Sequence, residues 1–159
     1  EYFKFGNLKL KLIHIPGHTL GHVCFYFEKE KIIFTGDTLF SLGCGRIFEG
    51  TYKQMYKSLE KIKNLPEDTK IYCGHEYTLK NSQFCKKIDS KNINLDKKIL
   101  EIKSKRLSNL PTVPSTLKDE LDCNVFLRCD DEEIKSSLNI KSGNSVEVFK
   151  KLRDLKDNF

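Results

Sequence analysis

Hydrophobic and polar residues alternate in the first part of the chain, a pattern typical of β-strands with one buried face. The alternation is strict at the start of residues 8–15 (LKLKLIHI), and β-rich runs follow at 23–27 and 31–35. Charged residues 28–30 separate those two runs and predict a turn. A fourth short strand is expected at 70–73.

The spacing of apolar residues becomes helical in two places. Residues 51–64 repeat apolar side chains at helical intervals, and Pro66 ends that pattern. Beyond the last predicted strand we expect only helices, at 79–89, 94–108, 131–139 and 144–157. The pattern therefore predicts an α/β region at 1–77, followed by a small all-helical domain at 78–159.

Composition limits the class of protein. A hydrophobic fraction of 38% in 159 residues can form a core in one domain or two small ones. The net charge of +6 comes mainly from lysine, without a basic and aromatic stripe, so we expect no nucleic-acid partner. The charge would suit a small anionic substrate. No apolar run approaches the ~20 residues of a membrane span, so we expect no membrane partner.

The six cysteines never form a C-x-x-C pair, which argues against a zinc ribbon and against a thioredoxin-like redox motif. Their number would allow three disulfides, but a chain of this size does not need them. We therefore expect inert thiols in a reducing compartment and a cytoplasmic location, with an organelle as the alternative. The chain does not begin with methionine, which suggests a piece of a longer protein.

Three residues with metal-binding side chains each follow a predicted strand and a glycine. They are His18, Asp37 and His75. Binding sites of open α/β sheets lie at strand ends, and imidazole with carboxylate suits a borderline divalent metal. We therefore expect these side chains to converge on a metal site. The alternative is that the histidines are ordinary polar residues of a turn.

The residues around these positions resemble motifs of the metallo-β-lactamase superfamily: PGHTLGH at 16–22 and GDTLF at 36–40. Four further motifs are similar to the hydroxyacylglutathione hydrolase (glyoxalase II) family. They are GCGR with FEGT within 43–51, YCGHEYT at 72–78, PTVPSTL at 111–117 and LRDLKDNF at 152–159. These motifs cover nearly the whole chain in the family's order.

The resemblance implies the C-terminal half of a metallo-β-lactamase αββα sandwich followed by the helical domain. It implies hydrolysis of the thioester of S-D-lactoylglutathione to glutathione and D-lactate. Two divalent ions are implied, zinc foremost, with iron and manganese as alternatives. By motif matching, His18 binds one ion, His75 binds the other and Asp37 bridges them, so that a metal-bound hydroxide attacks the thioester carbonyl.

The resemblance also implies which residues contact glutathione. Arg46 matches a basic residue near the glycine carboxylate, and Tyr77 matches a tyrosine that touches the substrate. Arg153 and Lys156 match a basic pair, and their i, i+3 spacing places both on one helix face. Phe48 stands where the family often has tyrosine, so it keeps the ring but loses a hydroxyl donor.

Two further histidines do not match family ligands. We expect His22 to orient the turn or support a ligand from behind, rather than bind a metal. His14 precedes the turn within a strand and is expected to pack or to form a hydrogen bond.

The superfamily's first motif, T-H-x-H-x-D-H, does not occur in residues 1–159. In the family it lies upstream, so we expect this chain to be the C-terminal part of a longer enzyme and weakly active or inactive by itself. One alternative is an inactive chain that keeps a glutathione-binding surface. Another is a single-iron enzyme similar to persulfide dioxygenases, which lack the long helical region. The sequence leaves the metal, the acyl group and the oligomeric state open.

Overall fold

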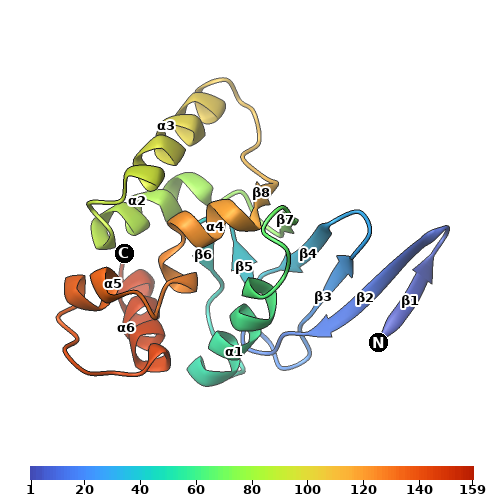
Figure 1. Ribbon diagram of the computed structural model, residues 1–159, viewed down its shortest axis with the longest axis horizontal. Coiled ribbons are helices and arrows are strands. Elements are labelled where there is room, and N and C mark those ends of the chain that lie inside the picture. The colour runs from blue at the N-terminus through green and yellow to red at the C-terminus, as the bar shows by residue number, and fades with distance from the viewer.

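The computed structural model describes residues 1–159, and its secondary structure changes along the chain from mainly strands to mainly helices (Figure 1). The strands are β1 Tyr2–Phe5, β2 Leu8–His14, β3 Val23–Phe27, β4 Ile32–Gly36, β5 Leu39–Phe40, β6 Gly43–Cys44, β7 Lys70–Cys73 and β8 Ser115–Thr116. The helices are α1 Tyr52–Lys63, α2 Thr78–Ile88, α3 Ile93–Leu107, α4 Leu117–Cys123, the 3₁₀ turn η1 Val125–Leu127, α5 Glu132–Ser137 and α6 Ser145–Asp157.

Six strands form one sheet in the order β1-β2-β3-β4-β7-β8. All neighbours are antiparallel except β4 and β7, which are parallel and are connected through α1. Strands β5 and β6 form a separate two-stranded hairpin. The β1–β2 hairpin projects from one end of the molecule, and the later helices gather at the other end (Figure 1). No helix combines the length and the apolar character needed to cross a bilayer.

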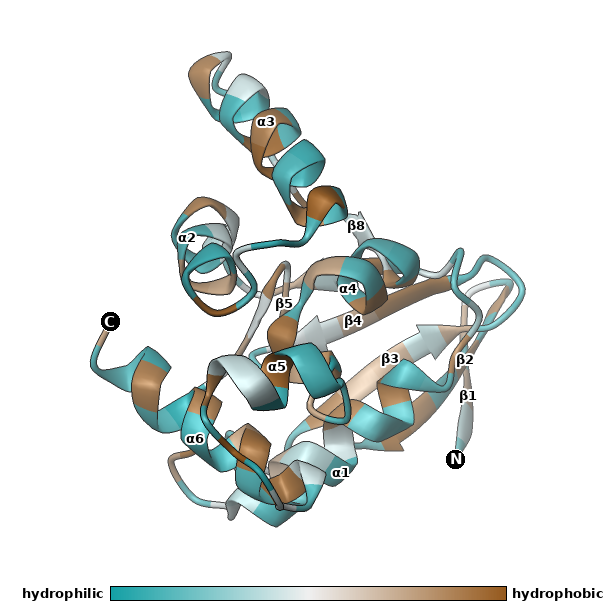
Figure 2. Cartoon of the chain, turned by 60° about the vertical axis from the view of Figure 1, so that its left-hand side comes forward, coloured by the Kyte–Doolittle hydropathy of each residue, from teal (hydrophilic) through white to brown (hydrophobic).

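The sheet buries one of its faces against α1. Tyr26 and Ile33 belong to the same cluster of 26 buried residues as Met55 and Leu59 of α1. Hydrophobic residues are concentrated in the central strands (Figure 2). Strand alternation and the helical spacing of α1 therefore meet in one core.

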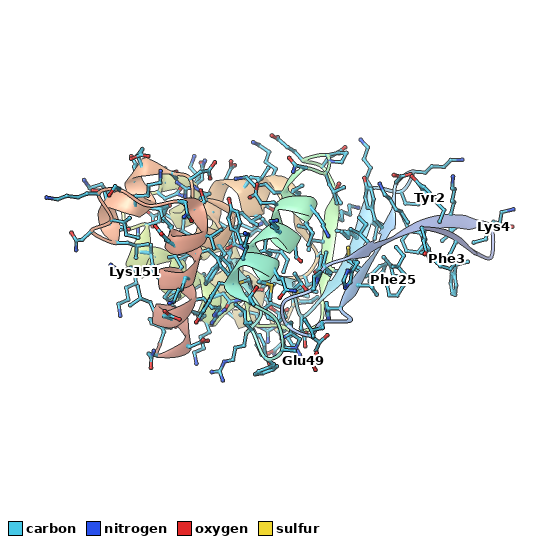
Figure 3. The ribbon with its side chains drawn as sticks, turned by 90° about the horizontal axis from the view of Figure 1, so that it is seen from below. Tyr2, Phe3, Lys4, Phe25, Glu49 and Lys151 are labelled. Atoms are coloured by element: carbon cyan, nitrogen blue, oxygen red, sulfur yellow. The ribbon has the colours of Figure 1, made fainter.

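The other face of the sheet is apolar but exposed. Phe25 and Phe34 are cross-strand partners in β3 and β4, and each exposes more than 40% of its surface. Phe3 points to the same side as Phe25, whereas Tyr2 points to the other (Figure 3). The sheet therefore presents a row of aromatic side chains that nothing in this chain covers.

The predicted elements agree with the structure to within one or two residues at most ends, and those missed are short. Strand β1 was not predicted, nor was the β5–β6 hairpin. The predicted all-helical region contains β8, which pairs with β7, and it also contains α4 and η1. Residues from both regions belong to one hydrophobic core, so the core itself does not mark a boundary at 77/78. The division into two domains there remains a prediction.

Candidate functional site

The three predicted metal-binding side chains converge. The Asp37 Oδ2 atom lies 3.5 Å from His18 Nε2, and Asp37 Oδ1 lies 3.4 Å from His75 Nε2. The aspartate therefore stands between the two histidines, one carboxylate oxygen facing each ring. This convergence was predicted from strand ends, and the distances confirm it; metal binding by these residues remains a prediction.

Backbone packing brings Asp37 and His75 together. Both follow parallel neighbours, β4 and β7, and the Gly74 amide donates to the Gly36 carbonyl at 2.9 Å. A Cβ atom on Gly74 would lie 2.5 Å from Asp37 Oδ1, so only glycine allows the carboxylate to approach the backbone this closely. The glycine before His75 therefore has a steric role in the site.

A hydrogen bond orients the His18 ring. Its Nδ1 atom lies 2.8 Å from the Arg46 carbonyl oxygen, an acceptor, so Nδ1 carries the proton. In the neutral ring, Nε2 then presents a lone pair to the Asp37 carboxylate, which also offers only lone pairs. Two acceptors that face each other in this way suit a cation between them.

The chain has few side chains that could bind a metal ion in this region. No group of three or more histidine, cysteine, aspartate or glutamate side chains is placed to hold one metal ion together. Instead, His18 with Asp37, and Asp37 with His75, are two pairs of neighbouring donor side chains that share one carboxylate. The donor types fit zinc, iron or manganese, whereas the donor number is below that of a complete site.

The remaining histidines have local partners. The His22 Nε2 atom accepts the Asp37 backbone amide at 3.2 Å, which places His22 behind the aspartate. This contact agrees with the expected supporting position of His22. The His14 Nε2 atom lies 2.8 Å from the Leu20 carbonyl and spans the turn that contains His18.

A pocket of about 570 Å³ opens beside the three residues. All eight residues predicted to bind metal or substrate line it, although they come from positions 18 to 156. Aromatic rings flank the histidines: Tyr77 stacks on His75 at 4.8 Å between ring centroids, and Phe48 lies 4.9 Å from His18. The pocket walls are therefore aromatic near the histidines.

The basic residues of the pocket differ in environment. The Lys156 ammonium lies over the rings of Phe84 and Phe159, and burial, followed by repulsion from Arg153, lowers its pKa to about 8. Arg46 is exposed and lies 3.6 Å from Asp157. Lys156 and Arg46 are therefore the accessible cations among the predicted substrate residues.

Arg153 is almost entirely buried, with 3% of its surface exposed. Its Nη1 atom donates to the Cys44 carbonyl at 2.6 Å, and its Nη2 atom donates to Asp157 at 2.9 Å. Shared helix spacing correctly places Arg153 beside Lys156 at the pocket. Its guanidinium, however, is engaged within the protein, so its predicted contact with substrate remains a prediction.

Sequence reasoning missed seven other lining residues, namely Phe40, Cys44, Gly45, Lys80, Asn81, Asp157 and Phe159. Lys80 and Asn81 lie in the first turn of α2, just after the GHEYT motif. Their closeness in sequence to His75 and Tyr77 could have indicated that they line the same pocket. Phe40 ends the GDTLF motif, and its ring lies 5.9 Å from His75. Phe159 ends the LRDLKDNF motif, but its place in the pocket depends on how α6 packs.

Comparison with known families identifies the family of the chain. Residues 76–159 match the family model described as hydroxyacylglutathione hydrolase C-terminus, which is more than half of the chain. The chain belongs to the hydroxyacylglutathione hydrolase family. Residues 3–75 match the metallo-β-lactamase superfamily, whose members use divalent metals. The predicted family and fold class are thereby confirmed.

Named relatives of this hydroxyacylglutathione hydrolase family member cover nearly the whole chain. The hydroxyacylglutathione hydrolase of Pelagibacter ubique (strain HTCC1062) is 61% identical over 153 residues, which is 96% of this chain and 58% of the relative. The enzyme of that name from Chelativorans sp. (strain BNC1) is 46% identical over 159 residues, 100% of this chain and 62% of the relative. The chain thus spans about 60% of the length of these relatives.

Solved structures support the fold of this family member. A metallo-β-lactamase from Staphylococcus aureus has a TM-score of 0.56 at 25% identity and covers 98% of this chain and 41% of its own. ETHE1 from Myxococcus xanthus also has a TM-score of 0.56, at 21% identity, covering 98% of this chain and 56% of its own. The likeness to ETHE1 shows a shared fold.

Proposed function

We propose that this chain is the substrate-binding part of an enzyme that hydrolyses 2-hydroxyacylglutathione thioesters, typically S-D-lactoylglutathione, to glutathione and a 2-hydroxy acid such as D-lactate. The observation that carries the proposal is the Asp37 carboxylate between the Nε2 atoms of His18 and His75 at one pocket. Family membership supports the reaction class.

His18 and Asp37 would hold one divalent ion, and Asp37 and His75 the other, with zinc as the proposed metal. When bound, such ions supply Lewis acidity and lower the pKa of a coordinated water. The chain's own contribution is orientation. The Arg46 carbonyl fixes the His18 tautomer, and His22 holds the Asp37 backbone in place.

Glutathione carries carboxylates, and the pocket offers cations to bind them. Lys156 and Arg46 would bind a carboxylate of the thiol half, while Tyr77 and Phe48 would flank the chain beside the histidines. Because these contacts lie away from the reacting carbonyl, they would act equally in the ground state and the transition state. Phe48 lacks the hydroxyl donor of a tyrosine, which would weaken binding by about 1 kcal/mol.

The low number of metal ligands favours a second candidate, a chain that binds glutathione but does not catalyse by itself. The two candidates make different predictions for one experiment. We would measure S-D-lactoylglutathione hydrolysis and bound zinc for this chain and for a version extended at its N-terminus by the corresponding segment of the Pelagibacter ubique relative.

The proposal expects low activity and substoichiometric zinc in this chain, and a large gain of both in the extended version. Glutathione binding without any gain of activity in the extended version would favour the non-catalytic candidate. Full zinc content and equal kcat/KM in both versions would contradict the proposal that this chain supplies only part of the metal ligands.

A further inference from the structure

Side chains of the helical region bind the backbone of Ser41–Cys44, the segment at the tip and second strand of the β5–β6 hairpin. Four of these side chains are more than nine-tenths buried, and we call them the polar clasp: Asn81, Glu120, Asn124 and Arg153. Their partners are, in the same order, the Ser41 carbonyl at 3.1 Å, the Leu42 amide at 2.8 Å, the Gly43 carbonyl at 3.2 Å and the Cys44 carbonyl at 2.6 Å.

Glu120 is the central member of the polar clasp. It has no exposed surface, and its Oε2 atom accepts both the Leu42 amide and the Asn124 side-chain amide, the latter at 2.9 Å. Leu42 has a φ of +58°, in the left-handed region that non-glycine residues seldom adopt. Each strand of the hairpin has two residues, so it needs such outside partners to keep its shape.

The chain that leaves this hairpin leads directly to His18. The Arg46 carbonyl accepts from His18 Nδ1 at 2.8 Å, and the Phe48 amide donates to the His18 carbonyl at 3.2 Å. The Gly50 amide donates to the Gly17 carbonyl at 3.1 Å. Residues 45–50 therefore join the hairpin to both the ring and the backbone of His18.

We propose that Glu120 is a positioning residue for His18. Glu120 accepts the Leu42 amide and, with the other members of the polar clasp, holds the β5–β6 hairpin in one conformation. Residues 45–50 continue from that hairpin, and the Arg46 carbonyl among them orients the His18 imidazole. Glu120 does not contact the pocket, and neither family membership nor the predicted site assigns it a role. The inference rests on the proposed function for the importance of His18, but its test measures orientation rather than activity.

The hydrogen-bond pattern distinguishes substitutions of Glu120. Both bonds to its carboxylate arrive at one oxygen, and a glutamine carbonyl oxygen can accept the same two donors. Glu120→Gln should therefore keep the hairpin, whereas Glu120→Ala removes the acceptor. Asn124→Ser offers a milder test, because a serine can still accept the Phe126 amide that Asn124 caps but cannot reproduce the amide donor to Gly43.

Asp89 provides a matched control. Its carboxylate is also buried, and it accepts from Arg128 and Asn92 in the helical region, away from the hairpin. Asp89→Asn should lower global stability by weakening a buried charge pair. It leaves every contact of the polar clasp in place.

The experiment compares the 159-residue chain with these four variants by nitrogen-15 NMR. It records the His18 imidazole signals and the hydrogen exchange of the Phe48 and Gly50 amides. We expect Glu120→Ala and Asn124→Ser to lose the Nδ1–H signature of His18 and to exchange faster at these two amides. Glu120→Gln and Asp89→Asn should keep the parent signature, the latter despite a lower melting temperature.

Retention of the Nδ1–H signature and slow exchange in both Glu120→Ala and Asn124→Ser would overturn the proposal. So would loss of the signature in Asp89→Asn, because it would show that any destabilisation disturbs His18. If Glu120→Ala does not fold, Asn124→Ser decides between these outcomes. Failure of the proposed hydrolase activity would leave all of these measurements interpretable.

Discussion

Single residues of the pocket control how much positive charge it offers. Lys156 lies 5.3 Å from the centroid of the Phe84 ring and 5.0 Å from that of Phe159, and burial, followed by repulsion from Arg153, lowers its pKa to about 8. An ammonium is therefore present at neutral pH and is lost as the pH rises through about 8. A bound carboxylate favours the protonated form, so affinity should fall in the same range.

We predict that the chain binds S-methylglutathione more weakly at about pH 9.5 than at about pH 7. Loss of one charge-assisted contact corresponds to roughly a tenfold rise in Kd. Isothermal titration calorimetry across this range measures the change. The Lys156→Arg variant stays charged and should show little pH dependence; an equal dependence in that variant would assign the effect to another group.

A second prediction concerns the glycine that precedes His75. Gly74→Ala places a Cβ atom 2.5 Å from Asp37 Oδ1 and should displace that carboxylate. Zinc affinity of the chain, measured by competition with a chromogenic chelator, should fall by about tenfold or more. Gly21→Ala is the control, because nothing lies within 4 Å of its added Cβ atom. Similar zinc affinities in both variants would refute the steric role of Gly74.

The convergence of His18, Asp37 and His75 could be predicted from sequence because strand ends and glycines are local signals. The environment of Arg153 could not. Helical spacing shows that it shares a face with Lys156, but its main partner, the Cys44 carbonyl, lies 109 residues away in sequence. Which of two neighbouring cations is buried depends on the packing of α6, and that packing leaves no local pattern.

Among the secondary-structure elements, those with a long periodic pattern were predicted and those without one were missed. Strands β5, β6 and β8 have two residues each, too few to show alternation. Helix α4 did carry a signal: Thr116 and Asp119 form a capping box at its start. The capping box begins two residues after Pro114. Because Pro111 and Pro114 predict a break in regular structure, no helix was predicted there.

Helix α6 is joined to the β5–β6 hairpin through Arg153, which leads to a prediction about stability. Arg153→Ala leaves the buried Cys44 carbonyl without its donor, while the exposed Asp157 keeps Arg46 nearby, so the free energy of unfolding should fall by about 2 kcal/mol. Lys156→Ala removes a partly exposed cation without an ion-pair partner and should cost less than about 1 kcal/mol. Urea unfolding of both variants measures the difference; equal losses would show that Arg153 is no anchor.

The whole molecule has one covered and one bare sheet face. The bare face carries Phe25 and Phe34, and apolar surface of this kind favours association. The predicted division at 77/78 is less visible at this scale, because β8 completes the sheet of the first region. Sequence patterns show where strands change to helices, but they do not show that both parts share a core.

We predict that the isolated chain self-associates through this bare face. The Phe25→Thr/Phe34→Thr variant should sediment as a smaller species than the parent chain at the same concentration. The control replaces Ile93 and Leu100, two exposed apolar residues of α3, with threonine and should leave association unchanged. Equal dissociation in both variants would mean that the sheet face is not the contact surface.

The polar clasp joins the β5–β6 hairpin to a residue that is synthesised 109 positions after Cys44. Arg153 belongs to the final turns of α6, yet it binds the carbonyl of Cys44. During synthesis, the hairpin would therefore leave the ribosome long before its last anchor exists. A nonsense mutation at position 153 would delete both Arg153 and Lys156. Such a product would keep His18, Asp37 and His75 in its sequence. The β5–β6 hairpin, which positions His18 through residues 45–50, would lack its contact with Arg153.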